Sequence, residues 1–238
     1  MSFTARRSDA QWRSAIMHNE AVARVSSLDG ACQVTHGMYF WPLEPSHPGD
    51  DYSIETIAHG LCGKSRWSGF TKHNDRKFSV AQHSVHVADI VNLNRKKLVP
   101  GGQWGLRPSP ALCGLLHDGS EAWIDDIVRP VKYKLTGYTE VEKSLQMEIY
   151  ARHNCPIDGI ITEAVRRVDN MMIFLERDEL MGKPVVPYSN EFDHPRITIH
   201  DVVPDFRIWS PEEAYERFLD KYEEIVRYDG NHAPDEYI

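Results

Sequence analysis

The pair His117-Asp118 closes an apolar run, residues 111–116, of the kind that forms a buried helix. Adjacent helical residues point about 100° apart, so neighbours can bind one ion only from a shared inner face. A buried carboxylate needs a partner or a metal ion, because loss of solvent penalises its charge. We therefore expect a helix over 109–121 that carries a metal-binding pair.

Two further residues extend the pair into a candidate metal site. His83 lies on the apolar stripe of a helix that we predict over 80–92, and Asp169 lies among apolar residues of a long helix predicted over 158–181. Mixed imidazole and carboxylate ligands suit one divalent ion, for which we expect Co²⁺, Mn²⁺, Zn²⁺ or Mg²⁺. Such an ion can polarise a phosphate and activate water, which indicates a phosphohydrolase. The predicted ligands are His83, His117, Asp118 and Asp169.

Each of these residues, taken alone, has a simpler explanation. A single inward histidine is more often a hydrogen-bonded core residue. A single aspartate in a long helix is more often solvated. The combination of a His-Asp pair in an apolar helix with an upstream helical histidine and a downstream helical aspartate is hard to explain by packing.

The remaining pattern predicts a mostly α fold, a helical bundle with a short N-terminal β-hairpin. Apolar periodicity and capping residues predict helices over 53–65, 139–153 and 211–228. The segment 31–44 is typical of a strand or hairpin, and 8–28 of an irregular helix or arm.

Breaks in this pattern suggest loops and a division of the chain. The basic, Gly- and Pro-rich segment 93–108 predicts an exposed loop, and 183–207 an extended loop or lid. We expect an N-terminal arm over 1–30, a catalytic core over 31–182, and a C-terminal loop and helix over 183–238 that pack on the core.

Composition restricts the partners. The formal net charge of −8 does not attract a nucleic acid polymer through its overall field. No run of about 18 apolar residues is present, so we expect no membrane span, and the N-terminus does not read as a signal peptide. The cysteines form no CxxC pair, which favours reduced thiols and a cytoplasmic location. They are Cys32, Cys62, Cys113 and Cys155.

Several short motifs recur together in one known group of enzymes. They are IAHGL at 57–61, RWSG at 66–69, FSVAQHS at 78–84, LLHDGSE at 115–121 and RPVKY at 129–133, followed by Asp169. With these motifs the chain resembles the HD-domain phosphohydrolases, whose metal motif is H…HD…D, over residues 33–180. More closely, it resembles the bacterial 5′-deoxynucleotidases and the phage dATP triphosphohydrolases.

The resemblance implies roles for these residues. The predicted ligands match the family's metal ligands, with Asp118 part of the catalytic centre, and Glu121 matches a glutamate that acts as general acid or base. Residues three apart on a helix share a face, so Glu121 can reach a metal-bound water or the leaving oxygen. The alternative for Glu121 is a surface residue at a helix end.

The resemblance also implies a substrate pocket. Arg66 and Trp67 match a pair that lines the nucleotide site, although a solvated arginine beside a packed tryptophan is the simpler alternative. Asp126 matches a carboxylate near the sugar hydroxyl, and its neighbour Asp125 could take that place instead. Two further residues, Lys132 and His86, are candidates for contact with the phosphate. For Lys132 the sequence pattern is equally that of an ordinary surface lysine.

The implied activity is hydrolysis of a deoxynucleotide, best matched by dATP or dAMP. Water bound to the metal would attack the α-phosphorus and release a deoxynucleoside with triphosphate or phosphate. Alternatives are an enzyme for another nucleotide or phosphate ester, and a nucleotide-binding module without turnover. The resemblance further implies a homo-oligomer, and a host cytoplasm if the chain is phage-encoded.

Overall fold

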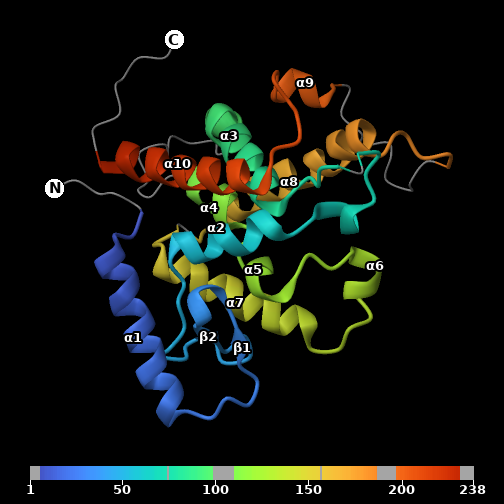
Figure 1. The fold of residues 1–238 in the computed structure, drawn as a ribbon. Coiled ribbons are helices and arrows are strands. Elements are labelled where there is room, and N and C mark those ends of the chain that lie inside the picture. The colour runs from blue at the N-terminus through green and yellow to red at the C-terminus, as the bar shows by residue number, and fades with distance from the viewer. Residues whose placement is uncertain (1–5, 74, 99–109, 156, 187–196, 231–238) are drawn as a thin grey trace.

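Helices dominate the part of the chain that the computed structural model describes, residues 6–73, 75–98, 110–155, 157–186 and 197–230 (Figure 1). The longer helices are α1 (Asp9–Val25), α2 (Ile54–Gly63), α3 (Val80–Leu98), α7 (Tyr138–Arg152), α8 (Gly159–Leu180) and α10 (Pro211–Gly230). The shorter ones are α4 (Pro110–Leu116), α5 (Glu121–Ile124), α6 (Arg129–Lys132) and α9 (Ile199–Val202). Strands β1 (Cys32–Gln33) and β2 (Tyr39–Phe40) pair antiparallel. The predictions of a mostly α fold and of an N-terminal hairpin are confirmed.

Five of the six longer helices begin at a side chain that caps them, and α2, α3 and α8 are examples. Ser53, Ser79 and Asp158 each accept a hydrogen bond from the backbone N–H three residues further on. The first N–H groups of a helix lack partners within it, so these oxygens satisfy a donor that would otherwise be unpaired. These side chains help to fix where α2, α3 and α8 begin.

The core forms where α3, α4, α8 and α10 pack together. α3 lies against α4 and α8, and α10 crosses over α2, α3 and α4 (Figure 1). The α3 and α4 backbones come close at Gly114, where an added Cβ would lie 3.2 Å from the Cα of Ala88. This close approach packs the middle of α3 against α4, while His83 lies in the first turn of α3 and His117 directly follows α4.

The predicted helix over 109–121 is wrong in its C-terminal part. α4 ends at Leu116, and His117 and Asp118 lie in the turn that follows. Gln146 of α7 holds this turn: its side-chain amide donates to the Leu116 carbonyl over 2.6 Å and accepts from the Ser120 N–H over 3.1 Å. A side chain distant in sequence thus satisfies the groups that the interrupted helix leaves open.

Other boundaries also differ from the predictions. α3 continues to Leu98, so the first part of the predicted loop 93–108 is helical, while 99–109 lies outside the described residues. The predicted loop 183–207 contains α9, and its residues 187–196 are likewise not described. The predicted arm contains a regular helix, α1.

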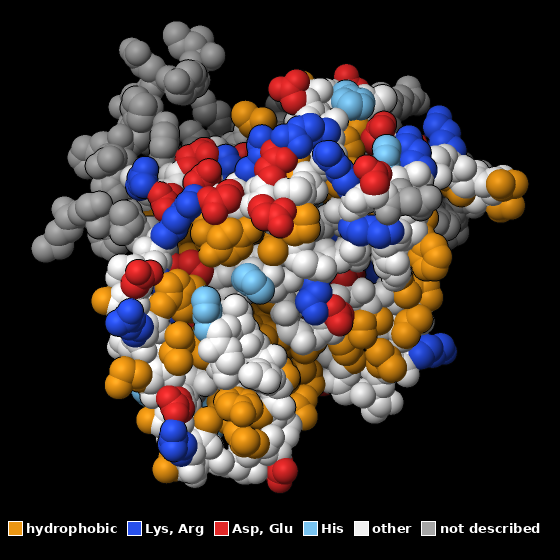
Figure 2. Space-filling model, viewed as in Figure 1, with side chains coloured by type: hydrophobic (Ala, Val, Ile, Leu, Met, Phe, Trp, Pro, Cys, Tyr) orange, Lys and Arg blue, Asp and Glu red, His pale blue; other side chains and the backbone are white. Residues whose placement is uncertain are grey.

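The outer face of α10 carries charges of both signs. Figure 2 shows acidic and basic side chains interleaved there, and ion pairs such as Arg217–Glu213 and Arg227–Glu223 join them along the helix. These pairs are exposed and contribute little stability, but they leave no single-sign field on this face. Among the described helices, none has the length and apolar character needed to cross a membrane.

Candidate metal centre

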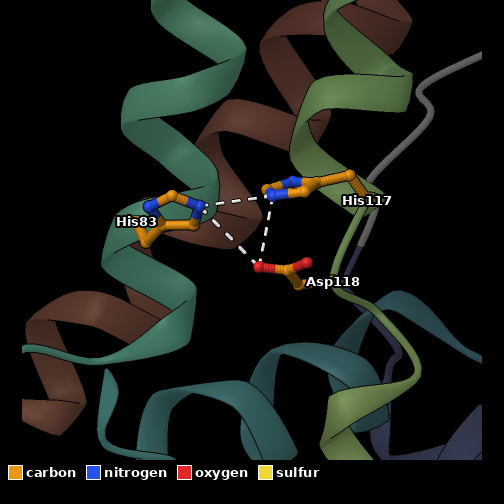
Figure 3. Close-up of side chains that lie close together, drawn as sticks. All are labelled: His83, His117 and Asp118. Atoms are coloured by element: carbon orange, nitrogen blue, oxygen red, sulfur yellow. Dashed lines mark hydrogen bonds and ion pairs between the residues drawn. The ribbon is translucent and has the colours of Figure 1, made fainter. Parts of the chain in front are cut away.

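Two histidines and an aspartate meet between α3 and the turn after α4 (Figure 3). The Nε2 atoms of His83 and His117 lie 3.2 Å apart, and Asp118 Oδ2 lies 3.2 Å from His117 Nε2 and 3.7 Å from His83 Nε2. One ligand atom from each residue lies within 4.8 Å of the others. The cluster of His83, His117 and Asp118 could therefore hold a metal ion.

The ring nitrogen that faces away from the cluster, Nδ1, has a hydrogen-bond acceptor in both histidines. His83 Nδ1 lies 2.5 Å from a carboxylate oxygen of Glu176, and His117 Nδ1 lies 2.8 Å from the carbonyl oxygen of Gly114. Since both partners accept, each Nδ1 donates a hydrogen, and each Nε2 can present its lone pair to the cluster. Lone pairs that face each other at this distance require a positive charge between them, either a proton or a metal ion.

Asp169 of α8 lies beside this cluster. Its Oδ1 is 3.3 Å from His83 Nε2 and 3.9 Å from His117 Nε2, while its Oδ2 is 3.5 Å from Arg129 Nη2. The fold thus brings Asp169 beside both histidines of the cluster, so all four predicted ligands lie at the same site.

The electrostatic environment of the cluster favours a positive charge. Burial and Arg66 lower the pKa of His83, but Glu176 and Asp169 outweigh them and raise it to about 9. Burial raises the pKa of Asp118, but His117 and His83 outweigh it, so this carboxylate stays ionised. A protonated His83 is the simpler alternative to a metal ion, and metal titration separates the two.

Glu176 is the residue of this centre that the sequence analysis missed. It is fully buried on α8 and accepts from His83 Nδ1 and, over 3.1 Å, from Arg66 Nε. Burial raises its pKa, but Arg66 and His83 outweigh it and keep the carboxyl ionised. Its spacing from Asp169, two helical turns along the same face, is the signal that could have found it.

Glu121 lies at the start of α5 and is buried, with 7% of its surface exposed. Within the described residues, its Oε2 has no hydrogen-bond partner. Burial and the charges of Asp118 and Asp126 raise its pKa well above the usual range for glutamate. The alternative of a surface glutamate at a helix end is therefore wrong.

Arg66 lies inside the centre. Its Nη1 is 3.4 Å from Asp118 Oδ2 and its Nη2 is 3.9 Å from Asp169 Oδ1, while Glu176 holds its Nε. Burial lowers the pKa of Arg66, but the three carboxylates outweigh burial and raise this pKa above its ordinary value. The alternative of a solvated arginine does not hold.

Trp67 has a different environment from its neighbour. It packs against the cluster of Phe78, Leu180 and Ile208, as the packing alternative expects. Its φ of 59° is a left-handed conformation that costs energy for a residue other than glycine. Within the described residues its buried Nε1 has no hydrogen-bond partner. A nucleotide contact at Trp67 stays a prediction.

The neighbouring residues Asp125 and Asp126 have different surroundings. Asp125 is exposed and pairs with Lys64 over 2.6 Å. Asp126 is partly buried, and burial together with Asp118 raises its pKa while Arg66 opposes the rise. Asp126 therefore interacts electrostatically with the cluster, whereas Asp125 pairs with Lys64 at the surface. Lys132 is ion-paired with Glu142.

His86 lies in an aromatic packing site. Its ring is 5.0 Å from that of Trp209, and its Nε2 lies 3.1 Å from the side-chain nitrogen of Gln82. Burial lowers its pKa to about 3, so the ring is neutral. This environment disfavours the predicted phosphate contact, because a neutral ring that packs on aromatic side chains adds no positive charge.

Comparison with known proteins leaves the family open. No protein-family model matches the chain. An uncharacterized protein of Rhodobacter capsulatus is 33% identical over 135 residues, which are 56% of this chain and 64% of that protein. The match thus spans less than two thirds of the relative's length. The uncharacterized protein YfdR of Escherichia coli is 26% identical over 176 residues, 74% of this chain and 85% of YfdR.

Proposed function

We propose that this chain is a metal-dependent phosphohydrolase that acts on deoxynucleotides. The observation that carries the proposal is the pair of Nε2 atoms, 3.2 Å apart, that face each other beside the Asp118 carboxylate. Their Nδ1 atoms both have acceptors, which leaves the lone pairs free for an ion. The sequence resemblance to the HD-domain phosphohydrolases supports the same ligands.

The donor set fits a divalent ion of borderline hardness. His83, His117, Asp118 and Asp169 would hold it, and two nitrogens with two carboxylates suit Mn²⁺, Co²⁺ or Zn²⁺. Such an ion would polarise a phosphoryl oxygen and make a water molecule more acidic.

In this proposal, Glu121 would move the proton. Its raised pKa means that the carboxyl can hold a proton in this buried setting, and its Oε2 is unpaired among the described residues. A carboxyl of this kind can take a proton from the attacking water or give one to the leaving oxygen. The surroundings separate the two carboxyls, because His117 and His83 lower the pKa of Asp118, whereas burial and the charges of Asp118 and Asp126 raise the pKa of Glu121.

Arg66 supplies charge for the phosphate. Glu176 anchors its Nε, and its terminal nitrogens lie near Asp118 and Asp169 at the edge of the cluster. Phosphoryl transfer depends mainly on positioning and charge stabilisation, so a fixed guanidinium beside the ion suits this reaction. Bidentate binding of a phosphate would require Arg66 to exchange one of these carboxylate contacts.

The substrate class rests on the resemblance. A deoxynucleotide with an adenine base is the best-supported choice, and water would attack its α-phosphorus. The products would be a deoxynucleoside with phosphate from a monophosphate, or with triphosphate from a dNTP.

A product assay tests the proposal. Purified protein is incubated with a panel of dNMPs and dNTPs in the presence of Mn²⁺, Co²⁺, Zn²⁺ or Mg²⁺, beside Asp118→Asn and the matched control Asp125→Asn. We expect deoxynucleoside to appear with the wild type and with Asp125→Asn but not with Asp118→Asn. Absence of turnover on both classes, with metal bound, would contradict the deoxynucleotide proposal.

A further inference from the structure

Glu176 is a buried carboxylate between two donor groups. It has no exposed surface, and its two oxygens face two different donors. Oε1 lies 2.5 Å from His83 Nδ1, and Oε2 lies 3.1 Å from Arg66 Nε. An arginine Nε always donates, so Oε2 must accept, and Oε1 is then the group that decides which nitrogen of His83 carries the hydrogen.

We propose that Glu176 is a positioning residue that holds His83 with its hydrogen on Nδ1 and its lone pair on Nε2, directed at the ion. The inference rests on the proposed metal centre and names the residue that prepares one of its ligands. A carboxylate behind a metal-binding histidine fixes the ring's orientation and strengthens the nitrogen as a ligand. Among the residues that the structure describes, Glu176 is the hydrogen-bond partner of His83 Nδ1.

Glutamine at this position would reverse the arrangement. Its side chain has nearly the same shape, but one acceptor oxygen replaces two. Since Arg66 Nε can only donate, the amide oxygen turns toward Arg66 and the amide NH₂ faces His83 Nδ1. Two donors then oppose each other whenever His83 binds an ion through Nε2, so binding must break a buried hydrogen bond.

A purely structural role for Glu176 predicts something different. If the carboxylate only neutralises the buried charge of Arg66, Glu176→Gln lowers the melting temperature of the protein but leaves the metal affinity of the folded protein unchanged. Arg66→Met separates the two roles. Without Arg66 the amide oxygen is free to face His83, so Glu176→Gln should cost much less metal affinity in this background.

Zinc titration with NMR tests the inference. Zn²⁺ affinity is measured by calorimetry, and the His83 ring is assigned by ¹⁵N-edited NMR of the zinc-loaded protein. The variants are Glu176→Gln and the control Glu55→Gln, which makes the same change at a buried glutamate that accepts from the Arg7 N–H. We expect Glu176→Gln to weaken Zn²⁺ binding by about 10- to 100-fold and to weaken or abolish the hydrogen-bonded Nδ1–H signal. Glu55→Gln should leave both unchanged.

The outcomes separate this inference from the proposed function. Wild type that binds Zn²⁺, with Glu176→Gln binding equally well and keeping the Nδ1–H signal, overturns the positioning role alone. An equal loss of affinity with and without Arg66 overturns it as well. Wild type that binds no divalent ion contradicts the metal centre, and the positioning role with it.

Discussion

Replacing Gly60 by alanine should force α2 and α5 apart. A Cβ at this position would lie 2.6 Å from the Cβ of Ala122 and 2.9 Å from both its Cα and its carbonyl oxygen. Carbon atoms in contact normally lie about 3.5–4.0 Å apart, so the two backbones must separate by about 1 Å. Ala122 follows Glu121 directly, and the movement therefore reaches the proposed acid or base.

The expected cost is the difference of two terms. Overpacking costs about 1–3 kcal/mol, and backbone neighbours that cannot rotate away place Gly60→Ala near the upper value of about 3 kcal/mol. Alanine regains up to about 1 kcal/mol through its better helix propensity. The net loss in the free energy of unfolding is about 2 kcal/mol, which at about 2–4 °C per kcal/mol lowers the melting temperature by about 4–8 °C.

Gly63→Ala is the matched control, because it makes the same change in the same helix. A Cβ at Gly63 meets no atom within 4 Å. We expect this variant to be as stable as the wild type or slightly more stable. Urea unfolding and thermal melts of both variants give the comparison, and equal stability of Gly60→Ala and Gly63→Ala would refute the close packing of α2 on α5.

Three further predictions follow from single residues. Burial raises the pKa of Asp50 to about 7, and its Oδ2 lacks a partner among the described residues, so the protein should lose stability as the pH rises through this value. Asp50→Asn should remove this decline, seen as a smaller gap between melting temperatures at about pH 5 and about pH 8. Ser68 has a φ of 49°, and Ser68→Gly should raise the free energy of unfolding by up to about 1 kcal/mol in urea titrations. Glu121→Gln should lower kcat by about 100- to 10,000-fold while Mn²⁺ affinity stays within a few-fold of wild type; unchanged kcat would remove Glu121 from the proton transfer.

Local patterns in the sequence were enough to predict most helices. The helices predicted over 53–65 and 158–181 carry apolar stripes that run for several turns, and this signal depends only on residues close in sequence. The meeting of His83, His117, Asp118 and Asp169 was also predictable, because each lies at or beside an apolar stripe that must face the core.

The features that the sequence did not predict depend on contacts between segments that are distant along the chain. The helix over 109–121 breaks after Leu116 because Gln146, from another helix, bonds to the open backbone groups. The spacing of Glu176 from Asp169 places both on one face of α8, but the role of Glu176 depends on its contacts with Arg66 and His83, which are distant in sequence. The periodicity of apolar residues along one helix cannot predict such contacts between helices.

Measuring the metal content of the protein tests the proposed metal centre most directly. Protein stripped with a chelator is dialysed against Mn²⁺, Co²⁺ or Zn²⁺, and bound metal per chain is determined for the wild type, for Asp118→Asn and for the control Asp125→Asn. The proposed centre predicts one ion per chain in the wild type and in the control, and loss of that ion in Asp118→Asn. Wild type without bound metal would show that a proton and not a metal ion lies between His83 and His117. Asp118→Asn with the wild-type metal content would show that the bound ion does not depend on Asp118, which contradicts the proposed centre.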